Sequence, residues 1–416
     1  MIDTINPINF DITKNLHGHV RVELRDRWTG RVVDSQEKDN LVTDAVAKML
    51  QTNTWMSTIM SAVFTPIFQK VLGGIFLFDG TLTESASNIY FPSNVKLVAS
   101  AGQGADSAGA DRGSYNNAES VVTSTGFTTV WDFLTSQANG TIASLARTSH
   151  NYVAYPAFLP SPSAGLADGA FDSFGSAYFL GYDDTNKYLY VTPTSNSGTY
   201  TTSGIYRVSI DLDKIGLYNT LPPASKMTLV KTLSSSDGSA TANNYHYDKY
   251  DNNFVYATGT TLHLVAMDGT HTTKTLTGTS GSYFAVTENY YWRSTANIIY
   301  RIAKANTTNV QSYVTDATYN LVPDENDIVF AYNKSKGYQY ILYPDGTSKV
   351  QSSFVIGASS NYNYDARKVG QLYHLTGLQS SQHINTHYLG TIANLDSPVT
   401  KTSSQTMKIT YTLTEA

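Results

Sequence analysis

The middle of the chain takes its pattern from one stretch, Phe254-Val255-Tyr256-Ala257-Thr258-Gly259, which continues through residues 260–267 to Asp268-Gly269. Two apolar runs separated by a glycine turn and followed by an Asp-Gly turn indicate consecutive antiparallel strands. Residues 273–276 add a third run after the second turn. The stretch therefore predicts three short antiparallel strands joined by tight turns.

Similar aromatic triplets recur along the chain. They are Tyr188-Leu189-Tyr190, Phe254-Val255-Tyr256, Tyr290-Tyr291-Trp292, Ile328-Val329-Phe330 and Gln371-Leu372-Tyr373. Counted from the third residue of each triplet, the steps are 66, 36, 38 and 43 residues. Repeats of about 40 residues with several strands each are typical of blades around an axis. We expect a β-propeller-like domain of about five blades, although four or six blades, a β-solenoid or a sandwich also fit the spacing.

Sequence on both sides of the repeats predicts a second β-rich unit. Residues 19–25 and 31–33 flank a Trp28-Thr29-Gly30 turn, and residues 406–413 alternate polar and apolar side chains. Such alternation indicates half-buried strands, and the last strand most simply closes the sheet begun near residue 20. Apolar positions over residues 41–50 recur at helical spacing and predict a helix of about three turns.

These patterns give a mainly β fold with a split terminal domain. Residues 1–150, completed by 396–416, are expected to form a β-rich anchoring domain with one or two helices. Residues 151–395 are expected to form the inserted β-propeller-like domain. Compact domains tolerate such insertions because the ends of the inserted segment lie close together.

Composition excludes several classes of protein. The 416 residues include no cysteine, so disulfides and thiolate metal sites are excluded. The 28 basic and 33 acidic residues give a net charge of −5 with no basic cluster, which argues against nucleic acid as a partner. The start lacks a signal peptide pattern, and no window reaches about 18 consecutive apolar residues, so we expect no membrane insertion. The most apolar stretch, 55–78, predicts core helix and strand or a contact between subunits.

Three segments resemble structural proteins of tailed phages and prophages. They are residues 18–50 with the Gly30 turn and Asn40-Leu41-Val42, Trp131-Asp132-Phe133 running on to residue 142, and residues 397–414. The resemblance implies a virion protein of the tail, baseplate or collar, of fibre or receptor-binding type, assembled in the host cytoplasm. It implies that the terminal segments mount the protein on the particle and that the middle differs between relatives. It carries no catalytic residues.

Acidic residues recur just before the aromatic strands. They are Asp183, Asp184, Asp248, Asp251, Glu288, Asp324, Glu325, Asp327 and Asp365. Paired carboxylates can perform general acid and base hydrolysis of sugars. Their turn-forming contexts make capping of hairpins the default interpretation. We predict no catalytic residue and no enzyme.

Metal and cofactor motifs are weak in this sequence. Residues 248–253 offer oxygen ligands but lack the glycine and distal glutamate of a helix–loop–helix calcium site. His383 and His387 are four residues apart, yet zinc needs further ligands and a helix to align the pair. We predict no metal and no cofactor.

Aromatic side chains are the best candidates for binding. Tyrosine often occurs in runs, and rings at blade tips can stack on sugar rings while neighbouring polar groups form hydrogen bonds. The predicted ligand-binding residues are Tyr245, Tyr247, Tyr290, Tyr291, Trp292, Tyr362 and Tyr364.

The sequence is compatible with three functions from different classes. The first is a virion protein that presents the propeller to a host-surface glycan. The second is a purely structural connector of the tail, baseplate or collar that contacts other virion proteins. The third is a polysaccharide depolymerase, which we weigh lowest. In each case we expect the protein in the virion, with other virion proteins and further copies of itself as partners.

Overall fold

The computed structural model describes residues 16–46, 72–102, 109–122, 126–148, 155–156, 177–193, 196, 200–209, 227–276, 283–333, 336, 338–346, 348–352, 367–368, 374–376, 383–385 and 387–415. In this part of the chain the fold is almost entirely β, as predicted. None of the helices described there is long and apolar enough to cross a membrane.

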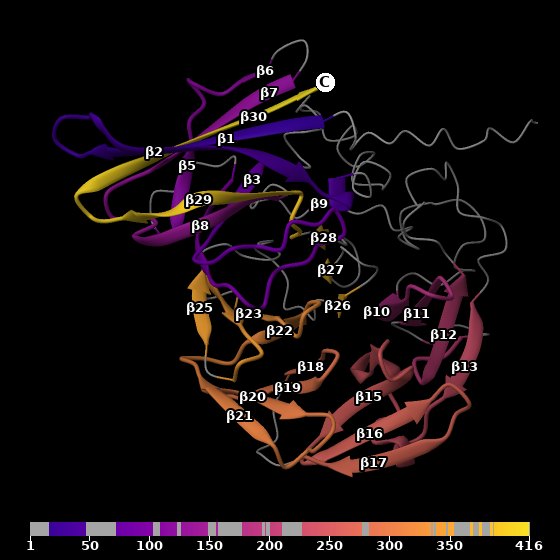
Figure 1. The fold of residues 1–416 in the computed structure, drawn as a ribbon. Helices are drawn as coiled ribbons and strands as arrows, with labels where there is room; N and C mark the ends of the chain where they lie inside the picture. Colours follow the sequence, from indigo (N-terminus) through magenta and orange to yellow (C-terminus); the bar gives the residue numbers. More distant parts are fainter. Residues whose placement is uncertain are drawn as a thin grey trace, which may run out of the picture.

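Ten strands from both ends of the chain form one sheet, which we call the terminal barrel (Figure 1). They are β1 (Leu16–Asp26), β2 (Val32–Val42), β3 (Gly74–Phe78), β4 (Leu97–Ala101), β5 (Arg112–Tyr115), β6 (Val121–Val122), β7 (Gly126–Phe133), β8 (Gly140–Thr148), β29 (Thr391–Lys401) and β30 (Gln405–Glu415). The order is β30-β1-β2-β29-β8-β3-β4-β5-β7, and β7 pairs again with β30. These nine strands therefore form a closed barrel. The short strand β6 pairs with β7 at Phe127 and Thr128.

The alternation of apolar and polar residues in the sequence explains how β1 and β30 pair in this barrel. Val20, Val22 and Leu24 of β1 are buried, and Ile409 of β30 lies opposite Val22 in the antiparallel register. Every second side chain of a strand points to the same face, so one apolar face is enough to fix the register. The predicted pairing of the last strand with the first hairpin is confirmed.

The helix predicted over residues 41–50 needs correction at its start. Leu41 and Val42 belong to β2 and pair with Ile392 and Thr391 of β29. A single helical turn follows at residues 44–46, and the remainder of the predicted helix lies outside the described residues. Two adjacent apolar residues fit both a helical and a strand period, and here pairing with the far end of the chain decides.

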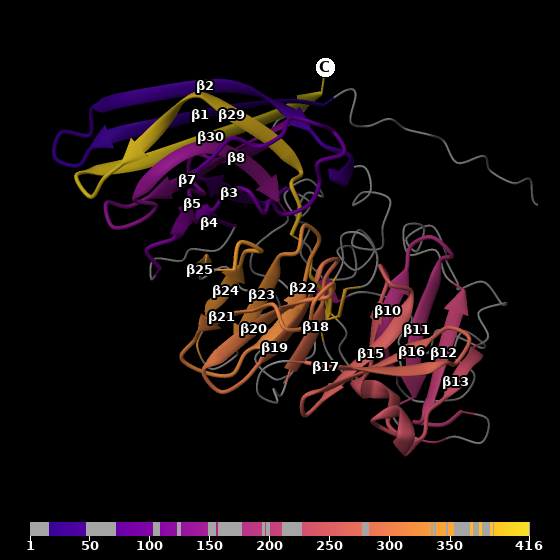
Figure 2. The ribbon, with the colours of Figure 1, turned by 60° about the horizontal axis from the view of Figure 1, so that its bottom comes forward.

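Five four-stranded antiparallel sheets are formed by the chain between β8 and β29, and they lie together on one side of the barrel (Figures 1 and 2). Sheet one is β10 (Ala177–Asp183), β11 (Tyr188–Pro193), β12 (Gly204–Ser209) and β13 (Thr228–Thr232). Sheet two is β14 (His246–Asp248), β15 (Asn253–Thr258), β16 (Thr261–Ala266) and β17 (His271–Thr275). Sheet three is β18 (Tyr283–Val286), β19 (Tyr290–Ser294), β20 (Ile298–Ala303) and β21 (Val310–Val314). Sheet four is β22 (Asn320–Pro323), β23 (Val329–Asn333), β24 (Tyr338–Leu342) and β25 (Lys349–Ser352). Sheet five is β26 (Arg367–Lys368), β27 (His374–Thr376), β28 (His383–Asn385) and β9 (Tyr155–Pro156).

The aromatic triplets of the first four repeats fall on the second strand of each sheet, except that Ile328 stands one residue before β23. The predicted three-strand unit is confirmed in sheet two, where Gly269 adopts a positive φ of 87° in the turn between β16 and β17. Gly346 does the same at 85° between β24 and β25. The fifth triplet, residues 371–373, lies outside the described residues.

The first strands of the five sheets face one another around an axis. β10 contacts β14 and β26, β18 contacts β14 and β22, and β22 also contacts β26. Sheet five joins the two ends of the insertion, because β28 pairs with β9, which precedes the other propeller strands in the chain. Apolar clusters fill the spaces between neighbouring sheets. This is the arrangement of a β-propeller.

A mixed apolar and polar joint connects sheet four to the barrel. Phe91 packs edge-on against Phe330, with ring centroids 5.4 Å apart. The Leu97 backbone N–H donates to the Tyr343 hydroxyl at 3.0 Å, and Lys96 lies over the ring of that tyrosine. One apolar cluster runs continuously across this joint, so packing fixes the orientation of the propeller on the barrel.

Candidate binding site

The inner strands of sheets one, two and four end in acidic turns that meet beside the propeller axis. A cavity of about 40 Å³ lies between them, which is enough room for a few water molecules. Its polar lining includes Asp184, Tyr247, Asp248, Lys249, Tyr250 and Asp324. Three of the acidic groups noted in the sequence before the aromatic strands, Asp184, Asp248 and Asp324, thus come together in space, and Asp365 lies outside the described residues.

Two of the aspartates first serve the turns in which they lie. Asp183 Oδ1 accepts hydrogen bonds from the backbone N–H groups of Thr185 and Asn186, both at 2.9 Å. Asp248 Oδ1 accepts from the N–H of Tyr250 at 3.1 Å. Aspartate stabilises tight turns in this way, and the predicted capping role is confirmed at both positions.

Lys249 connects three sheets across the axis. Its ammonium group forms an ion pair with Glu325 of sheet four and lies 3.9 Å from Oδ2 of Asp184, in the turn between β10 and β11 of sheet one. The Tyr250 hydroxyl donates to the other oxygen of Glu325 at 2.5 Å. Burial raises the pKa of Tyr250, and Glu325 raises it further, so the hydroxyl remains a donor.

Lys304 makes a deeply buried ion pair at the site. Its Nζ lies 2.5 Å from Asp248 Oδ2 and 3.3 Å from Asp251. The Asp248 side chain is fully buried and that of Lys304 is 9% exposed. Burial raises the pKa of Asp248, and the charge of Lys304 opposes this effect. An aspartate enclosed in this way cannot reach a substrate.

His387 lies just before barrel strand β29 and contacts Asp324 of the axial site. Its Nε2 lies 2.6 Å from Asp324 Oδ2, and both side chains are buried. The imidazole also packs against Phe330 with ring centroids 4.2 Å apart. Among the described residues no three ligating side chains converge as a metal site, and the His383 side chain is not among those described, so the absence of a metal stays a prediction.

Taken together, the carboxylates around the axis are held by cations or by turns. Hydrolysis of a glycoside needs two carboxylates that flank the scissile bond with space for the sugar. A cavity that admits a few waters does not provide this space. The geometry therefore favours an ionic hub that holds the sheets together over a hydrolytic site. The absence of an enzymatic activity stays a prediction.

The predicted ligand-binding aromatics do not form one site. Tyr247 is half-buried and lines the axial cavity. Tyr290 is half-buried at another position, where the Arg301 guanidinium lies 4.3 Å from its ring centroid. Tyr362 and Tyr364 lie outside the described residues.

Three of the predicted binding residues require correction because they are fully buried: Tyr245, Tyr291 and Trp292. The Tyr245 hydroxyl donates to the Asp237 backbone oxygen, and Trp292 Nε1 donates to Thr287 Oγ1 at 3.1 Å. Tyr291 packs toward sheet two and Trp292 toward sheet four. Both faces of the middle strands are covered by neighbouring sheets, so alternation along β19 exposes neither ring.

Sequence reasoning missed Lys249, Tyr250 and Lys304 as members of the axial site. The signal was present, because Lys249 and Tyr250 stand between two of the acidic residues already noted. Lys304 lies on a different sheet and has no local signal, since only the fold brings it to Asp248.

Comparison with known proteins gives only distant likeness. No family model matches this chain, and no curated protein matches it. Among solved structures, a chain of a nidogen/laminin complex is 12% identical, with a TM-score of 0.33 over 64% of this chain and 98% of that one. A streptogramin B lyase is 9% identical, with a TM-score of 0.29 over 56% of this chain and 93% of the lyase.

A catalytically inactive virginiamycin B lyase from Staphylococcus aureus, solved with quinupristin, is 10% identical. Its TM-score is 0.30, over 80% of this chain and 99% of that chain. Likeness at this level carries no argument about what this chain binds or does, so the function must be argued from its own residues.

Proposed function

We propose that this chain is a tailed-phage virion protein that attaches through the terminal barrel and displays the propeller, with the five four-stranded sheets as its blades. One observation carries the proposal. The three segments that resemble phage structural proteins are far apart in the sequence, yet they are neighbours in one sheet. Val20 of β1 lies opposite Tyr411 of β30, and Ile409 of β30 lies opposite Trp131 of β7. The resemblance thus follows one structural unit, as expected for an attachment module.

The joint between the two regions supports a display function. The Lys96–Asp345 ion pair, at 3.1 Å, adds to the aromatic packing of Phe91 on Phe330. Asn326 Nδ2 donates to the Phe91 carbonyl at 3.0 Å. A propeller held by such contacts keeps one orientation relative to its mount, which lowers the entropic cost of binding a surface.

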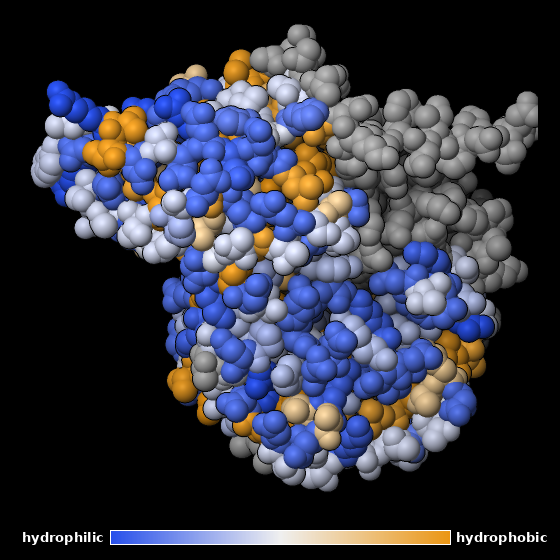
Figure 3. Space-filling model, viewed as in Figure 1, coloured by the Kyte–Doolittle hydropathy of each residue, from blue (hydrophilic) through white to orange (hydrophobic). Residues whose placement is uncertain are grey.

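The ligand we propose for the propeller is a host-surface glycan. Hydrophilic residues dominate the face of the propeller in Figure 3, and Tyr290 is one half-buried aromatic ring of the propeller. Sugars are bound by aromatic rings flanked by polar groups. The axial cavity is too small for a sugar ring, so we place this binding on the outer loops of the propeller.

A second candidate, the purely structural connector, is favoured by the hairpin of β1 and β2. Trp28 is 79% exposed at its tip, and Val33, in β2 of the same hairpin, is 54% exposed. Large apolar side chains gathered at one exposed point are typical of contacts between proteins. In this alternative the hairpin and the propeller both bind neighbouring virion proteins.

Binding of the labelled full chain to cells and purified wall polymers of the host bacterium separates the two candidates. The adhesin proposal predicts saturable binding that a wall glycan competes away, and it predicts that Trp28→Ala leaves this binding intact. The connector predicts that the folded protein binds no cells, and that Trp28→Ala removes the chain from assembled particles. Loss of cell binding in Trp28→Ala would contradict the assignment of host binding to the propeller.

A further inference from the structure

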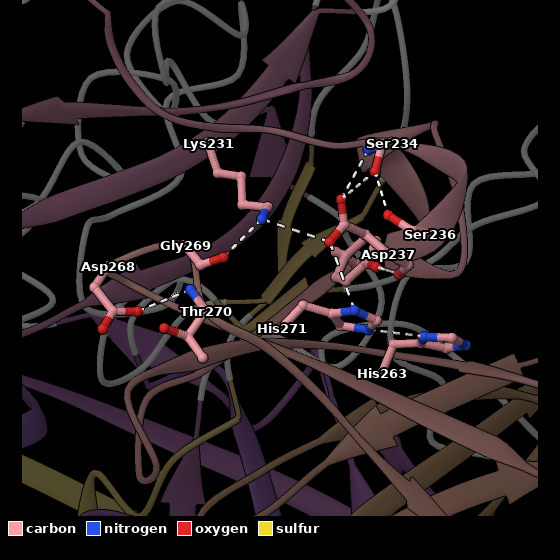
Figure 4. A network of polar contacts seen from close by, with 10 residues as sticks. Lys231, Ser234, Ser236, Asp237, His263, Asp268, Gly269, Thr270 and His271 are labelled. Atoms are coloured by element: carbon pink, nitrogen blue, oxygen red, sulfur yellow. Dashed lines mark hydrogen bonds and ion pairs between the residues drawn. The ribbon is translucent and has the colours of Figure 1, made fainter.

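A polar cluster connects sheets one and two at their outer strands, away from the axial cavity; Figure 4 shows its side chains. Lys231 comes from β13 of sheet one, and Asp237 from the short 3₁₀ turn that follows it. His263 and His271 come from β16 and β17 of sheet two. His263 lies opposite Thr273 in the ladder, so His271 is its diagonal neighbour on the same face.

The two imidazole rings are joined by one hydrogen bond. Nδ1 of His263 lies 3.1 Å from Nε2 of His271, and the rings are nearly parallel. His263 is 8% exposed, and its Nε2 is buried with no hydrogen-bond partner. This nitrogen faces Gly238, where a Cβ would stand 2.6 Å from it, so backbone fills the space on that side.

Charged groups surround this pair on the sheet-one side. Asp237 Oδ1 lies 3.7 Å from His271 Nδ1 and 3.5 Å from Lys231 Nζ. Burial alone would raise the pKa of Asp237, but hydrogen bonds from the Ser234 N–H and hydroxyl and the charge of Lys231 hold it below its ordinary value. Lys231 also donates to the Gly269 carbonyl at 2.7 Å, which ties β13 to the turn between β16 and β17.

Among the residues that the structure describes, the remaining neighbours add no second negative charge at the rings. Asp268, in the turn before β17, directs Oδ1 to the Thr270 N–H at 2.8 Å. From β15, Tyr256 stacks against His263 with centroids 6.3 Å apart. From β17, Lys274 is opposite Leu262 and therefore on the other face.

Proton counting follows from this geometry. A hydrogen bond between two imidazole nitrogens needs one donor and one acceptor. The pair keeps the bond when both rings are neutral, and also when one of them is an imidazolium. A second added proton makes both facing nitrogens donors, so the bond breaks. Asp237 would then face three positive charges, from Lys231 and the two imidazoliums.

We propose that the His263–His271 pair is an acid-sensitive lock between the first two sheets of the propeller, closed while the pair carries at most one added proton and opened by the second. The proposal is independent of what the propeller binds. Burial lowers the pKa of His263 below its ordinary value of 6.5, His271 lowers it further, and Asp237 acts in the opposite direction. A lowered pKa means that the stabilisation is complete above about pH 6.5 and is lost as pH falls below it.

Hydrogen exchange on the full chain tests the lock. Amide protection across residues 228–275 is compared at about pH 7 and pH 5, after correction for the intrinsic pH dependence of exchange. We expect wild type to lose protection in β13, β16 and β17 at the lower pH. His263→Gln and His271→Gln, which cannot accept the second proton, should show no such additional loss.

His246→Gln is the matched control, because His246 is a buried histidine of the same sheet outside the cluster. This variant should lose protection as wild type does. Because a glutamine variant could misfold, the histidine resonances of the wild type are also titrated by NMR, with variants used only for assignment. An ordinary titration of His263 near pH 6.5, or equal pH responses in wild type and both cluster variants, would overturn the proposal.

Discussion

The barrel and the propeller hide their side chains in different ways. The barrel has one large apolar cluster to which strands from both chain ends contribute, including Val20, Trp131 and Ile409. The propeller has several smaller clusters, each shared by two neighbouring sheets, and an ionic hub beside its axis. Burial of apolar side chains therefore stabilises the barrel, whereas the propeller also depends on charge pairing between its sheets.

One of the buried charges of the barrel, Arg147, fits this contrast. Arg147 is fully buried, and its guanidinium lies 4.7 to 5.2 Å from the ring centroids of Phe127, Trp131 and Tyr411. Burial lowers the pKa of Arg147 to about 10, which still leaves it protonated at neutral pH. Aromatic faces stabilise this cation, whereas carboxylates stabilise Lys249 and Lys304 in the propeller.

The largest expected effect comes from a hole in the barrel core. Trp131→Ala should lower the free energy of unfolding by about 3–5 kcal/mol, because a fully buried ring is removed and the surroundings relax only in part. Chemical denaturation followed by circular dichroism measures the loss. Trp28→Ala is the matched control, since that ring is exposed, and should change stability by less than about 0.5 kcal/mol. Equal losses in the two variants would show that the barrel lacks the core described.

A comparable test in the propeller removes one buried charge. Lys304→Met should cost about 3 kcal/mol, because it leaves the Asp248 carboxylate buried without its cation. The double variant Lys304→Met/Asp248→Asn should recover most of this loss, which no second polar substitution can do for Trp131→Ala. Denaturation of wild type, Lys304→Met, Asp248→Asn and the double variant gives the coupling free energy between the two residues. Additive losses in free energy of unfolding would contradict charge pairing as the cause.

A smaller effect is expected at the more exposed pair of the hub. Lys249 and Glu325 are 28% and 12% exposed, so solvent screens part of their interaction. Lys249→Met should cost about 1–2 kcal/mol, with most of it restored by Glu325→Gln in the same chain. Stability measured in low and high salt tests the origin of the effect, since the loss should shrink as salt rises. A loss that is insensitive to salt would point to packing instead.

The smallest expected difference appears between pH 7 and pH 5. In the described barrel strands His17 and His19 are exposed, whereas the propeller buries His246 and His263. Since burial lowers the pKa of His263, propeller stability should fall below about pH 6.5 while barrel stability should change little. Hydrogen exchange measured separately for barrel and propeller segments distinguishes their responses to pH. Loss of amide protection in the barrel before the propeller would contradict this prediction.

Local patterns predicted the strands that have one exposed face or a glycine turn. Val20, Val22 and Leu24 alternate with charged residues, and Gly269 marks its turn. The innermost strands were missed, because β14 has only three residues and β18 only four, too few to show a period.

The candidate site was predictable in its acids and unpredictable in its aromatics. Asp184, Asp248 and Asp324 stand in the recurrent acidic turns, and the fold brings them to one cavity. Tyr291 and Trp292 were misjudged, because exposure of a ring depends on the sheets on both sides of its strand. Pairing of Leu41 with Ile392 is equally invisible to local sequence, since the two residues meet only when the chain ends assemble.

Electron cryo-microscopy of purified particles from the host bacterium tests the proposed attachment through the barrel. We expect density for this chain with the terminal barrel against the particle and the propeller directed outward, in the orientation fixed by the joint at Phe91 and Phe330. Particles that lack the chain, or that enclose its propeller while the barrel faces solvent, would contradict this attachment.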